Sequence, residues 1–288
     1  MGTLTGMRAP AENAAILLEW YRAMGIDETI AGETRDWYAE IPRAEPSPIG
    51  IGADANVNRK PPIRERADLP HRVELAPDRA GVPSNDVMAA RELARSARTL
   101  NELRALLESF EGCALRATAS RLCLSRGSPD APLMLIGEAP GKDEDRQGQP
   151  FVGRAGQLLD RMLAAIGLTE ADVYITNIVF WRPPGNRTPS PEEVQACQPF
   201  LERQIELIAP KIVVFLGNAA AKQLTGATEG IMKLRGKWLE LPGHPGTRAM
   251  ATLHPAYLLR TPAAKRLAWR DMLAVRAALD AIEGGARP

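Results

Sequence analysis

Short apolar runs that alternate with longer amphipathic stretches constrain the fold of this chain more than any other feature. The apolar runs have the length of buried strands and lie at residues 133–137, 173–177, 211–216 and 249–253. The amphipathic stretches have helical spacing and lie at about residues 153–166, 191–208, 218–224 and 262–282. Strands that alternate with helices are typical of a parallel sheet covered on both faces. The sequence therefore predicts an α/β fold, a three-layer α/β/α sandwich with a central, mainly parallel four-stranded sheet.

The first third of the chain has a different composition. Apolar residues at helical spacing in residues 11–24 predict one amphipathic helix within an N-terminal segment, residues 1–35. Residues 36–84 are rich in proline and charge, which predicts a linker that is partly disordered. A tethered helix and tail, or an arm that binds a partner, would both suit this part. Residues 85–288 are expected to form one domain.

Composition and charge exclude several classes of protein. Hydrophobic residues make up 45% of the 288 residues and charged residues 25%, so the chain can bury a real core. The formal net charge is +1, which gives no global field for nucleic acid, although a neutral total can hide a basic face. No apolar run approaches the roughly 18 residues of a membrane helix, and three cysteines argue against a disulfide framework. We expect a soluble cytoplasmic protein with no membrane partner.

Polar side chains stand at the ends of three predicted strands. Glu138 follows the first strand, Asn177 ends the second, and His254 follows the fourth. In open parallel sheets, ligands bind outside the carboxyl ends of the strands. A carboxamide can both donate and accept hydrogen bonds, an imidazole can donate to a developing oxyanion, and a carboxylate can orient water or stabilise a cation. The sequence predicts a site at this edge.

Five motifs resemble those of the uracil-DNA glycosylases. They read Gly137-Glu-Ala-Pro-Gly141, Pro150-Phe-Val-Gly153, Tyr174-Ile-Thr-Asn177, Trp181-Arg-Pro-Pro-Gly-Asn-Arg187 and His254-Pro-Ala-Tyr-Leu-Leu-Arg260. The resemblance is to the family-four class in particular, whose familiar members carry an iron–sulfur cluster. It covers about residues 110–273 and does not extend to the first hundred residues.

The resemblance implies a monomeric, monofunctional glycosylase of base excision repair whose partner is uracil-containing DNA. Such an enzyme flips uracil out of DNA and hydrolyses its N-glycosidic bond, which leaves an abasic site. By resemblance, Asn177 binds the amide edge of uracil, Phe151 stacks on the ring, and the backbone at Glu138 and Ala139 helps to bind the base. His254 would stabilise negative charge on the departing base, and Glu138 would assist the water or the cationic sugar.

The resemblance leaves more than one candidate for the catalytic carboxylate. In the long-known uracil glycosylases the first motif reads Gly-Gln-Asp-Pro-Tyr, and its Asp activates water. Ala139 takes the place of that Asp and Glu138 the place of the Gln. Glu138 is the expected carboxylate, with Asp143, Glu144 and Asp145 of an acidic loop as alternatives. The departure also leaves open a relative that binds uracil-DNA with little turnover.

The resemblance also implies residues that contact DNA. Leu258 matches the apolar wedge that fills the space left by a flipped base. Arg182, Arg187 and Arg260 are expected to meet phosphate, with Lys265 and Arg266 as weaker candidates. Phosphate contacts position a protein without specifying sequence, which suits a protein that scans for a lesion.

Two of the four cysteines that would hold a cluster are replaced. Cys113 and Cys197 match the second and fourth ligand positions of the resemblance, whereas Phe110 and Trp181 fall on the first and third. Four thiolates normally hold a [4Fe–4S] cluster. We therefore expect no conventional cluster and no other metal, with the two aromatic rings packed in its place and the two cysteines as buried free thiols. The helical residues 86–108 would cover that side.

Overall fold

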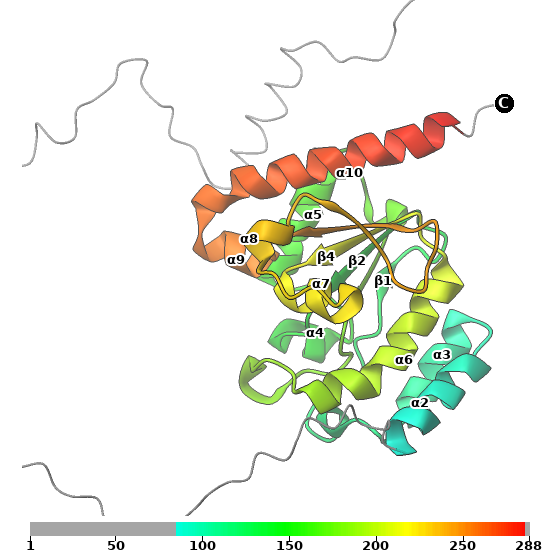
Figure 1. Cartoon of the computed structure of the whole chain (residues 1–288). Helices are drawn as coiled ribbons and strands as arrows, with labels where there is room; N and C mark the ends of the chain where they lie inside the picture. Colours follow the sequence, from blue (N-terminus) through cyan, green and yellow to red (C-terminus); the bar gives the residue numbers. More distant parts are fainter. Residues whose placement is uncertain (1–84, 286–288) are drawn as a thin grey trace, which may run out of the picture. The chain divides into compact units, whose positions relative to one another are not determined.

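The computed structural model describes residues 85–285 (Figure 1). The expected N-terminal segment 1–35 and linker 36–84 lie outside these residues and remain predictions. The described part is a sheet between two layers of helices, as the alternation of apolar and amphipathic stretches predicted. Between residues 85 and 285, no helix is long and apolar enough to span a membrane.

The sheet has six strands in the order β1-β3-β2-β4-β6-β5. Its four central strands are parallel and match the predicted runs: β2 Leu133–Gly137, β3 Val173–Asn177, β4 Ile212–Leu216 and β6 Arg248–Thr252. The expected number of four strands omitted two antiparallel edge strands, β1 Arg126–Gly127 and β5 Trp238–Glu240. These edges are two and three residues long, too short to carry a period in the sequence.

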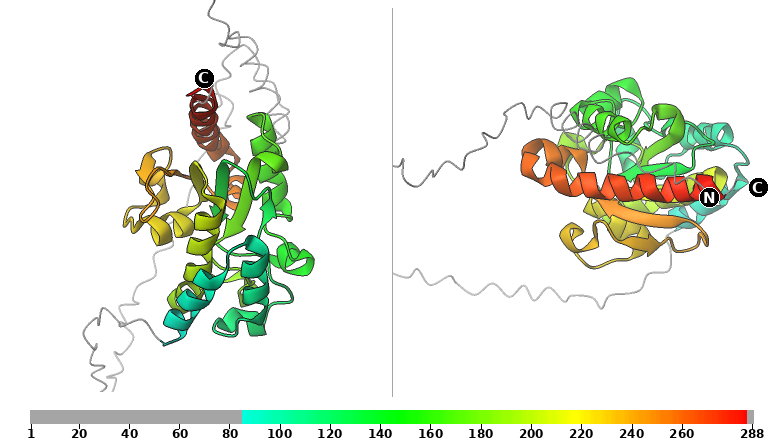
Figure 2. Two further views of the ribbon diagram at one scale, coloured as in Figure 1. Left: turned by 90° about the vertical axis from the view of Figure 1, so that its right-hand side faces the viewer. Right: turned by 90° about the horizontal axis from the view of Figure 1, so that it is seen from above.

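Alternate strand residues point to opposite layers, which makes two cores. Met134 and Ile136 of β2 pack in the first core, and Leu133 and Leu135 pack in the second. The first core is covered by α2 Asn85–Ser96, α3 Leu100–Ser109, α6 Pro191–Ile208 and α7 Asn218–Thr225. The second is covered by α5 Arg154–Ala165, α9 Pro255–Arg260 and α10 Lys265–Gly285. Figure 2 shows α10, in red, and the α2–α3 pair, in cyan, on different sides of the sheet.

The stretch expected to be helical, residues 86–108, forms two helices with a break that includes Thr99. The Thr99 hydroxyl oxygen accepts a hydrogen bond from the Glu102 amide at 3.1 Å, and the Glu102 carboxylate accepts one from the Arg98 amide at 2.6 Å. These bonds satisfy amides that a helix start otherwise leaves unpaired. The chain thus turns from α2 into α3 at this position.

Several short helices were not predicted. The residues expected to form an acidic loop belong to α4, Lys142–Gln147, which is too polar and too short to show helical periodicity. The others are α8 Ile231–Leu234 and the 3₁₀ turns η1 Ala114–Ala117, η2 Glu170–Asp172, η3 Pro184–Asn186 and η4 Pro262–Ala264. Most of them lie in the connections between the longer helices and the strands.

Candidate active site

A cleft of about 510 Å³ lies at the carboxyl ends of β2, β3 and β6. Its lining includes most of the predicted site residues: Glu138, Ala139, Phe151, Asn177, Arg187, His254 and Arg260. Segments that are far apart in the sequence meet here because their strands are parallel neighbours in the sheet. Two predicted residues, Arg182 and Leu258, are not part of the lining.

Asn177 is the most unusual polar side chain in the cleft. It is 1% exposed, and neither its Oδ1 nor its Nδ2 has a hydrogen-bond partner among the described residues. A buried polar group without a partner costs about 1–3 kcal/mol. Gly137 is needed beside it, because a Cβ there would lie 2.4 Å from Oδ1. A carboxamide held this way suits a ligand with an adjacent donor and acceptor.

Phe151 forms a wall of the cleft in a strained backbone conformation. Its φ is 56°, in the left-handed region that bulky residues rarely adopt. Its ring centroid lies 5.7 Å from that of His254, with 33° between the two planes. Gly156 makes the turn possible, since a Cβ at that position would lie 1.6 Å from the Phe151 carbonyl oxygen. The turn places an apolar ring beside the buried carboxamide.

Glu144 holds this turn with both carboxylate oxygens. Oε1 accepts from the amides of Val152 and Gly153 at 3.0 and 2.8 Å, and Oε2 accepts from the Gly141 amide at 3.1 Å. This structural role could not be read from the sequence, although a glutamate three residues after a helix start is a capping signal. A carboxylate engaged by three amides is not free to orient water.

The other two acidic candidates are also engaged away from the cleft. Asp145 is buried and accepts from the amides of Ser120 and Arg121 at 2.7 and 3.3 Å. Asp143 pairs with Arg146 at 3.3 Å, and neither aspartate lines the cleft. Two of the four carboxylates considered, Glu138 and Glu144, line the cleft, and the oxygens of Glu144 accept hydrogen bonds from backbone amides. Glu138 is therefore the remaining candidate for a carboxylate that acts on a ligand. Burial raises the pKa of Glu138 above its ordinary value, and a hydrogen bond from Thr188 opposes that shift.

His254 enters the cleft because β4 contributes no side chain at its end. Gly217, which follows β4, has a φ of 97°, and a Cβ there would lie 3.2 Å from the His254 Cβ. His254 caps α9, its Nδ1 accepting from the Ala256 amide at 3.1 Å. An accepting Nδ1 leaves the proton of a neutral imidazole on Nε2. Burial, with a smaller effect of Arg260, lowers the pKa of His254 to about 4, so it is a neutral donor at pH 7.

The predicted phosphate contacts divide into two groups. Arg260 lines the cleft, and Arg266 is exposed. Arg187 forms two hydrogen bonds with Glu193, and the Nε of Arg182 donates to the Asn186 side chain at 2.7 Å. Protein groups thus engage both guanidinium groups. Lys265 is 4% exposed, which does not suit a phosphate contact.

The assignment of an exposed wedge to Leu258 does not fit the structure. Leu258 is fully buried in the second core, whereas Tyr257 and Leu259 are 38% and 37% exposed. The expectation treated these residues as a loop, but they form α9, in which neighbouring side chains point in different directions. Tyr257, which lines the cleft, and Leu259 are the exposed apolar side chains of this helix.

Leu258→Ala is therefore expected to destabilise the protein by about 2–5 kcal/mol, because it leaves a cavity in the core. Leu259→Ala, its matched control, should change the free energy of unfolding by less than about 0.5 kcal/mol. Urea denaturation of both variants checks this. Equal stability of the two would show that Leu258 is not a core residue.

The four positions implied for cluster ligands do not fit a four-thiolate cluster. Phe110 packs against Phe200 with ring centroids 4.9 Å apart, and Trp181 is 3% exposed. Both rings are buried, as expected. Cys113 and Cys197 are buried free cysteines whose sulfur atoms lie 3.9 Å apart. Two thiols and two apolar rings cannot supply four thiolate ligands.

The helices on that side are those expected to cover it. Leu103 and Leu107 of α3 pack in the same core as Phe110, Cys113 and Cys197. In the described part of the chain, no group of three or more Cys, His, Asp or Glu side chains is arranged to hold a metal ion. The third cysteine, Cys123, lies elsewhere, with its sulfur 3.1 Å from the Glu144 carbonyl oxygen.

Comparison with known proteins gives a consistent assignment. The model of the uracil DNA glycosylase superfamily matches residues 124–273. The type-4 uracil-DNA glycosylase of Thermotoga maritima is 44% identical over 149 residues, which are 51% of this chain and 77% of that protein. The type-4 enzymes of Archaeoglobus fulgidus and Sulfurisphaera tokodaii are 40% and 37% identical, over 57% and 62% of this chain and 85% and 84% of their own lengths. The chain belongs to the uracil-DNA glycosylase superfamily.

Proposed function

We propose that this protein is a monofunctional uracil-DNA glycosylase that flips uracil out of DNA and hydrolyses its N-glycosidic bond. The observation that carries the proposal is the Asn177 carboxamide, buried in the cleft with both polar atoms unpaired. The relatives named type-4 uracil-DNA glycosylases support it, and the superfamily model matches residues 124–273, the segment that holds the whole cleft.

Recognition follows from the chemistry of the base. Uracil presents an N–H donor beside a carbonyl acceptor, so Asn177 can accept from the first with Oδ1 and donate to the second with Nδ2. The Phe151 ring supplies an apolar surface on which a planar base can stack. Because the cleft is bounded on several sides, the nucleotide must leave the duplex to reach Asn177.

Bond cleavage uses the two remaining groups. The bond between the sugar carbon C1′ and uracil N1 breaks, its electron pair stays with uracil, and water adds to C1′. The Nε2–H of neutral His254 donates to the oxygen of the departing uracil anion. Ionised Glu138 stabilises the positive charge that develops on the sugar and orients the water.

A uracil-DNA-binding relative with little turnover is the second candidate. Ala139 favours it, because it stands where other branches carry a water-activating aspartate. An oligonucleotide with one deoxyuridine, followed by alkaline cleavage of abasic sites, separates the two readings. We expect strand scission by the wild-type protein and much less by His254→Ala. Tight binding without scission, on both single- and double-stranded substrate, would favour the second candidate.

We also propose that the enzyme works without an iron–sulfur cluster. Protein purified without oxygen is expected to contain no stoichiometric iron, because Phe110 and Trp181 occupy two ligand positions. Iron analysis and the visible spectrum check this. A double variant with Cys113→Ala and Cys197→Ala should keep its excision activity within about twofold of the wild type. Stoichiometric iron with a broad visible absorption would end the idea.

A further inference from the structure

A buried polar network lies between β6 and α10, outside the cleft. Asp271 of α10 is 2% exposed, the smallest fraction of any carboxylate in the described part of the chain, and Thr252 at the end of β6 is fully buried. Neither residue lines the cleft. Taking a charge out of water is costly unless partners compensate it. The partners of Asp271 therefore indicate what this carboxylate does.

Asp271 accepts hydrogen bonds from two side chains. Arg235, which follows α8, donates from Nη2 to Oδ1 at 2.5 Å and from Nε to Oδ2 at 3.1 Å, and the Thr252 hydroxyl donates to Oδ2 at 2.7 Å. Two bonds from a guanidinium to one carboxylate fix direction as well as distance. Gly236 leaves room for the pair, since a Cβ there would lie 2.7 Å from Oδ1. The Thr252 hydroxyl is thus bonded to a rigid acceptor.

The last two residues of β6 are held by three other segments. The Gly236 amide, after α8, donates to the Ala251 carbonyl oxygen at 3.0 Å. The Gly217 amide, after β4, donates to the Thr252 carbonyl oxygen at 2.9 Å. The Thr252 hydroxyl adds the bond to Asp271 of α10. Because each bond comes from a different element, the end of this strand cannot shift without breaking one of them.

His254 takes its direction from the end of β6. It stands two residues after Thr252 and caps α9. Gly217, whose amide bonds Thr252, also lies close to the histidine, since a Cβ on this glycine would lie 3.2 Å from the His254 Cβ. The bond from the Ala256 amide to Nδ1 fixes the ring against the start of α9. The direction of the Nε2 donor therefore follows the path of the chain as it leaves β6.

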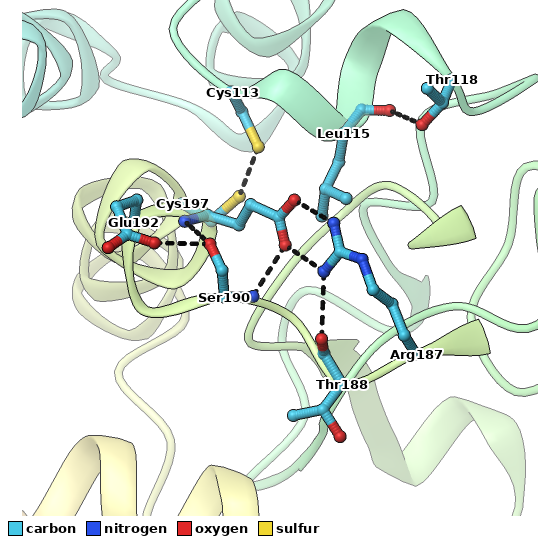
Figure 3. A network of polar contacts seen from close by, with 9 residues as sticks. Cys113, Leu115, Thr118, Arg187, Thr188, Ser190, Glu192 and Cys197 are labelled. Carbon is cyan, nitrogen blue, oxygen red and sulfur yellow. Dashed lines mark hydrogen bonds and ion pairs between the residues drawn. The ribbon is translucent and has the colours of Figure 1, made fainter. Parts of the chain in front are cut away.

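A second ion pair with a buried carboxylate lies at the start of α6 and supports a different segment. Arg187 donates to both oxygens of Glu193, whose Oε2 also accepts from the Ser190 amide at 2.7 Å (Figure 3). This pair holds the turn before α6, which carries none of the groups proposed to act on uracil. The Arg187 side chain is 47% exposed, whereas the side chains of Arg235 and Asp271 are 14% and 2% exposed.

We propose that Asp271 and Thr252 are positioning residues for His254. The Arg235–Asp271 pair holds the Thr252 hydroxyl, and Thr252 fixes the end of β6 from which His254 enters the cleft. This role rests on the proposed glycosylase function. Neither Asp271 nor Thr252 lines the cleft, so both act on the reaction through His254.

The first test is single-turnover uracil excision by Thr252→Val, which keeps the branched shape and removes the hydroxyl. At saturating enzyme the rate should fall about 10- to 100-fold, because displacement of a catalytic group by about 1 Å can cost about 10²-fold. Binding of uracil-DNA should change less than about twofold, because the His254 donor acts on charge that appears as the bond breaks. Thr252→Ser keeps the donor and should restore the rate. An unchanged rate in Thr252→Val would overturn the inference.

A double-mutant cycle and a matched control separate positioning from a general loss of structure. In a His254→Ala background, Thr252→Val should have little further effect, because the two residues act as one unit. The control is Thr247→Val, just before the other end of β6, where the Thr247 hydroxyl donates to the Pro210 carbonyl oxygen at 2.9 Å. This variant should excise uracil at the wild-type rate. An equal further loss in the His254→Ala background would overturn the inference, since the effect would then not pass through His254.

The second test needs no DNA and no activity. The chain has three histidines, so the NMR signals of the His254 ring nitrogens can be assigned from their loss in His254→Ala. These signals should shift in Thr252→Val, return in Thr252→Ser and stay unchanged in Thr247→Val. Signals that do not move in folded Thr252→Val would contradict the positioning role. Wild-type protein without excision activity would instead refute the proposed function, so the two failures are distinguishable.

Discussion

Asn177→Leu is expected to abolish most of the activity and to make the protein more stable. Leucine has a similar shape and removes two buried polar atoms that have no partner in the described structure. Relief of that burial should add about 1–3 kcal/mol to the free energy of unfolding. The same change removes both hydrogen bonds proposed for uracil, so kcat/KM should fall about 10³-fold or more. Urea denaturation and single-turnover excision measure the two effects.

The control for this variant is Asn101→Leu, at an exposed position in the first turn of α3. It should alter stability by less than about 0.5 kcal/mol and leave activity unchanged. A gain in stability together with a loss of activity would identify Asn177 as a residue kept for binding at a cost in folding energy. Asn177→Leu that is less stable than the wild type, or fully active, would contradict this role.

His254→Ala is expected to lower the single-turnover excision rate about 10²- to 10³-fold, the usual effect of removing one donor to a developing oxyanion. Binding of uracil-DNA should change much less, because the donor acts on charge that appears as the bond breaks. Rate measurements at saturating enzyme, with a separate binding titration, check both points. Loss of binding equal to the loss of rate would show that His254 acts in recognition.

Two further variants isolate the donor from the helix cap. In His254→Asn the side-chain oxygen can still accept a hydrogen bond from the Ala256 amide, which keeps the helix cap. The excision rate of this variant should fall as far as that of His254→Ala. Its free energy of unfolding should be about 1 kcal/mol higher than that of His254→Ala, because the cap is kept. His244→Ala, outside the cleft, should leave the rate unchanged. Because the pKa of His254 is about 4, the imidazole stays neutral above that pH. The loss of rate on the acidic side of the pH profile is therefore expected to come from protonation of Glu138, whose pKa is raised by burial. A loss of rate at acidic pH that persists in Glu138→Gln would contradict this assignment.

The position of the cleft was predictable, because one rule of parallel sheets relates strand order to ligand binding. Glu138, Asn177 and His254 each stand at the end of an apolar run, and those runs became β2, β3 and β6. Burial and strand alternation then placed their side chains together. The buried rings of Phe110 and Trp181 also followed from apolar side chains at positions that the resemblance assigns to ligands.

What could not be predicted depends on contacts between segments. The helix α4 has no apolar period, and its Glu144 is defined by amides of a later turn. Leu258 was placed by counting along an expected loop, whereas a helix turns each side chain by about 100°. The left-handed Phe151 has no signature in the sequence. The ion pair between Arg187 and Glu193 was missed, although Ser190-Pro-Glu-Glu193 is a recognisable capping box that could have placed Glu193.

Release of free uracil from DNA tests the central claim most directly. The wild-type protein and Asn177→Leu are incubated with DNA that contains deoxyuridine, and the free base is separated and measured in each reaction. We predict stoichiometric free uracil, with a matching number of abasic sites, from the wild-type protein and about 10³-fold slower release from Asn177→Leu. No free uracil from the folded wild-type protein, or equal release by the two proteins, would contradict the account of the cleft.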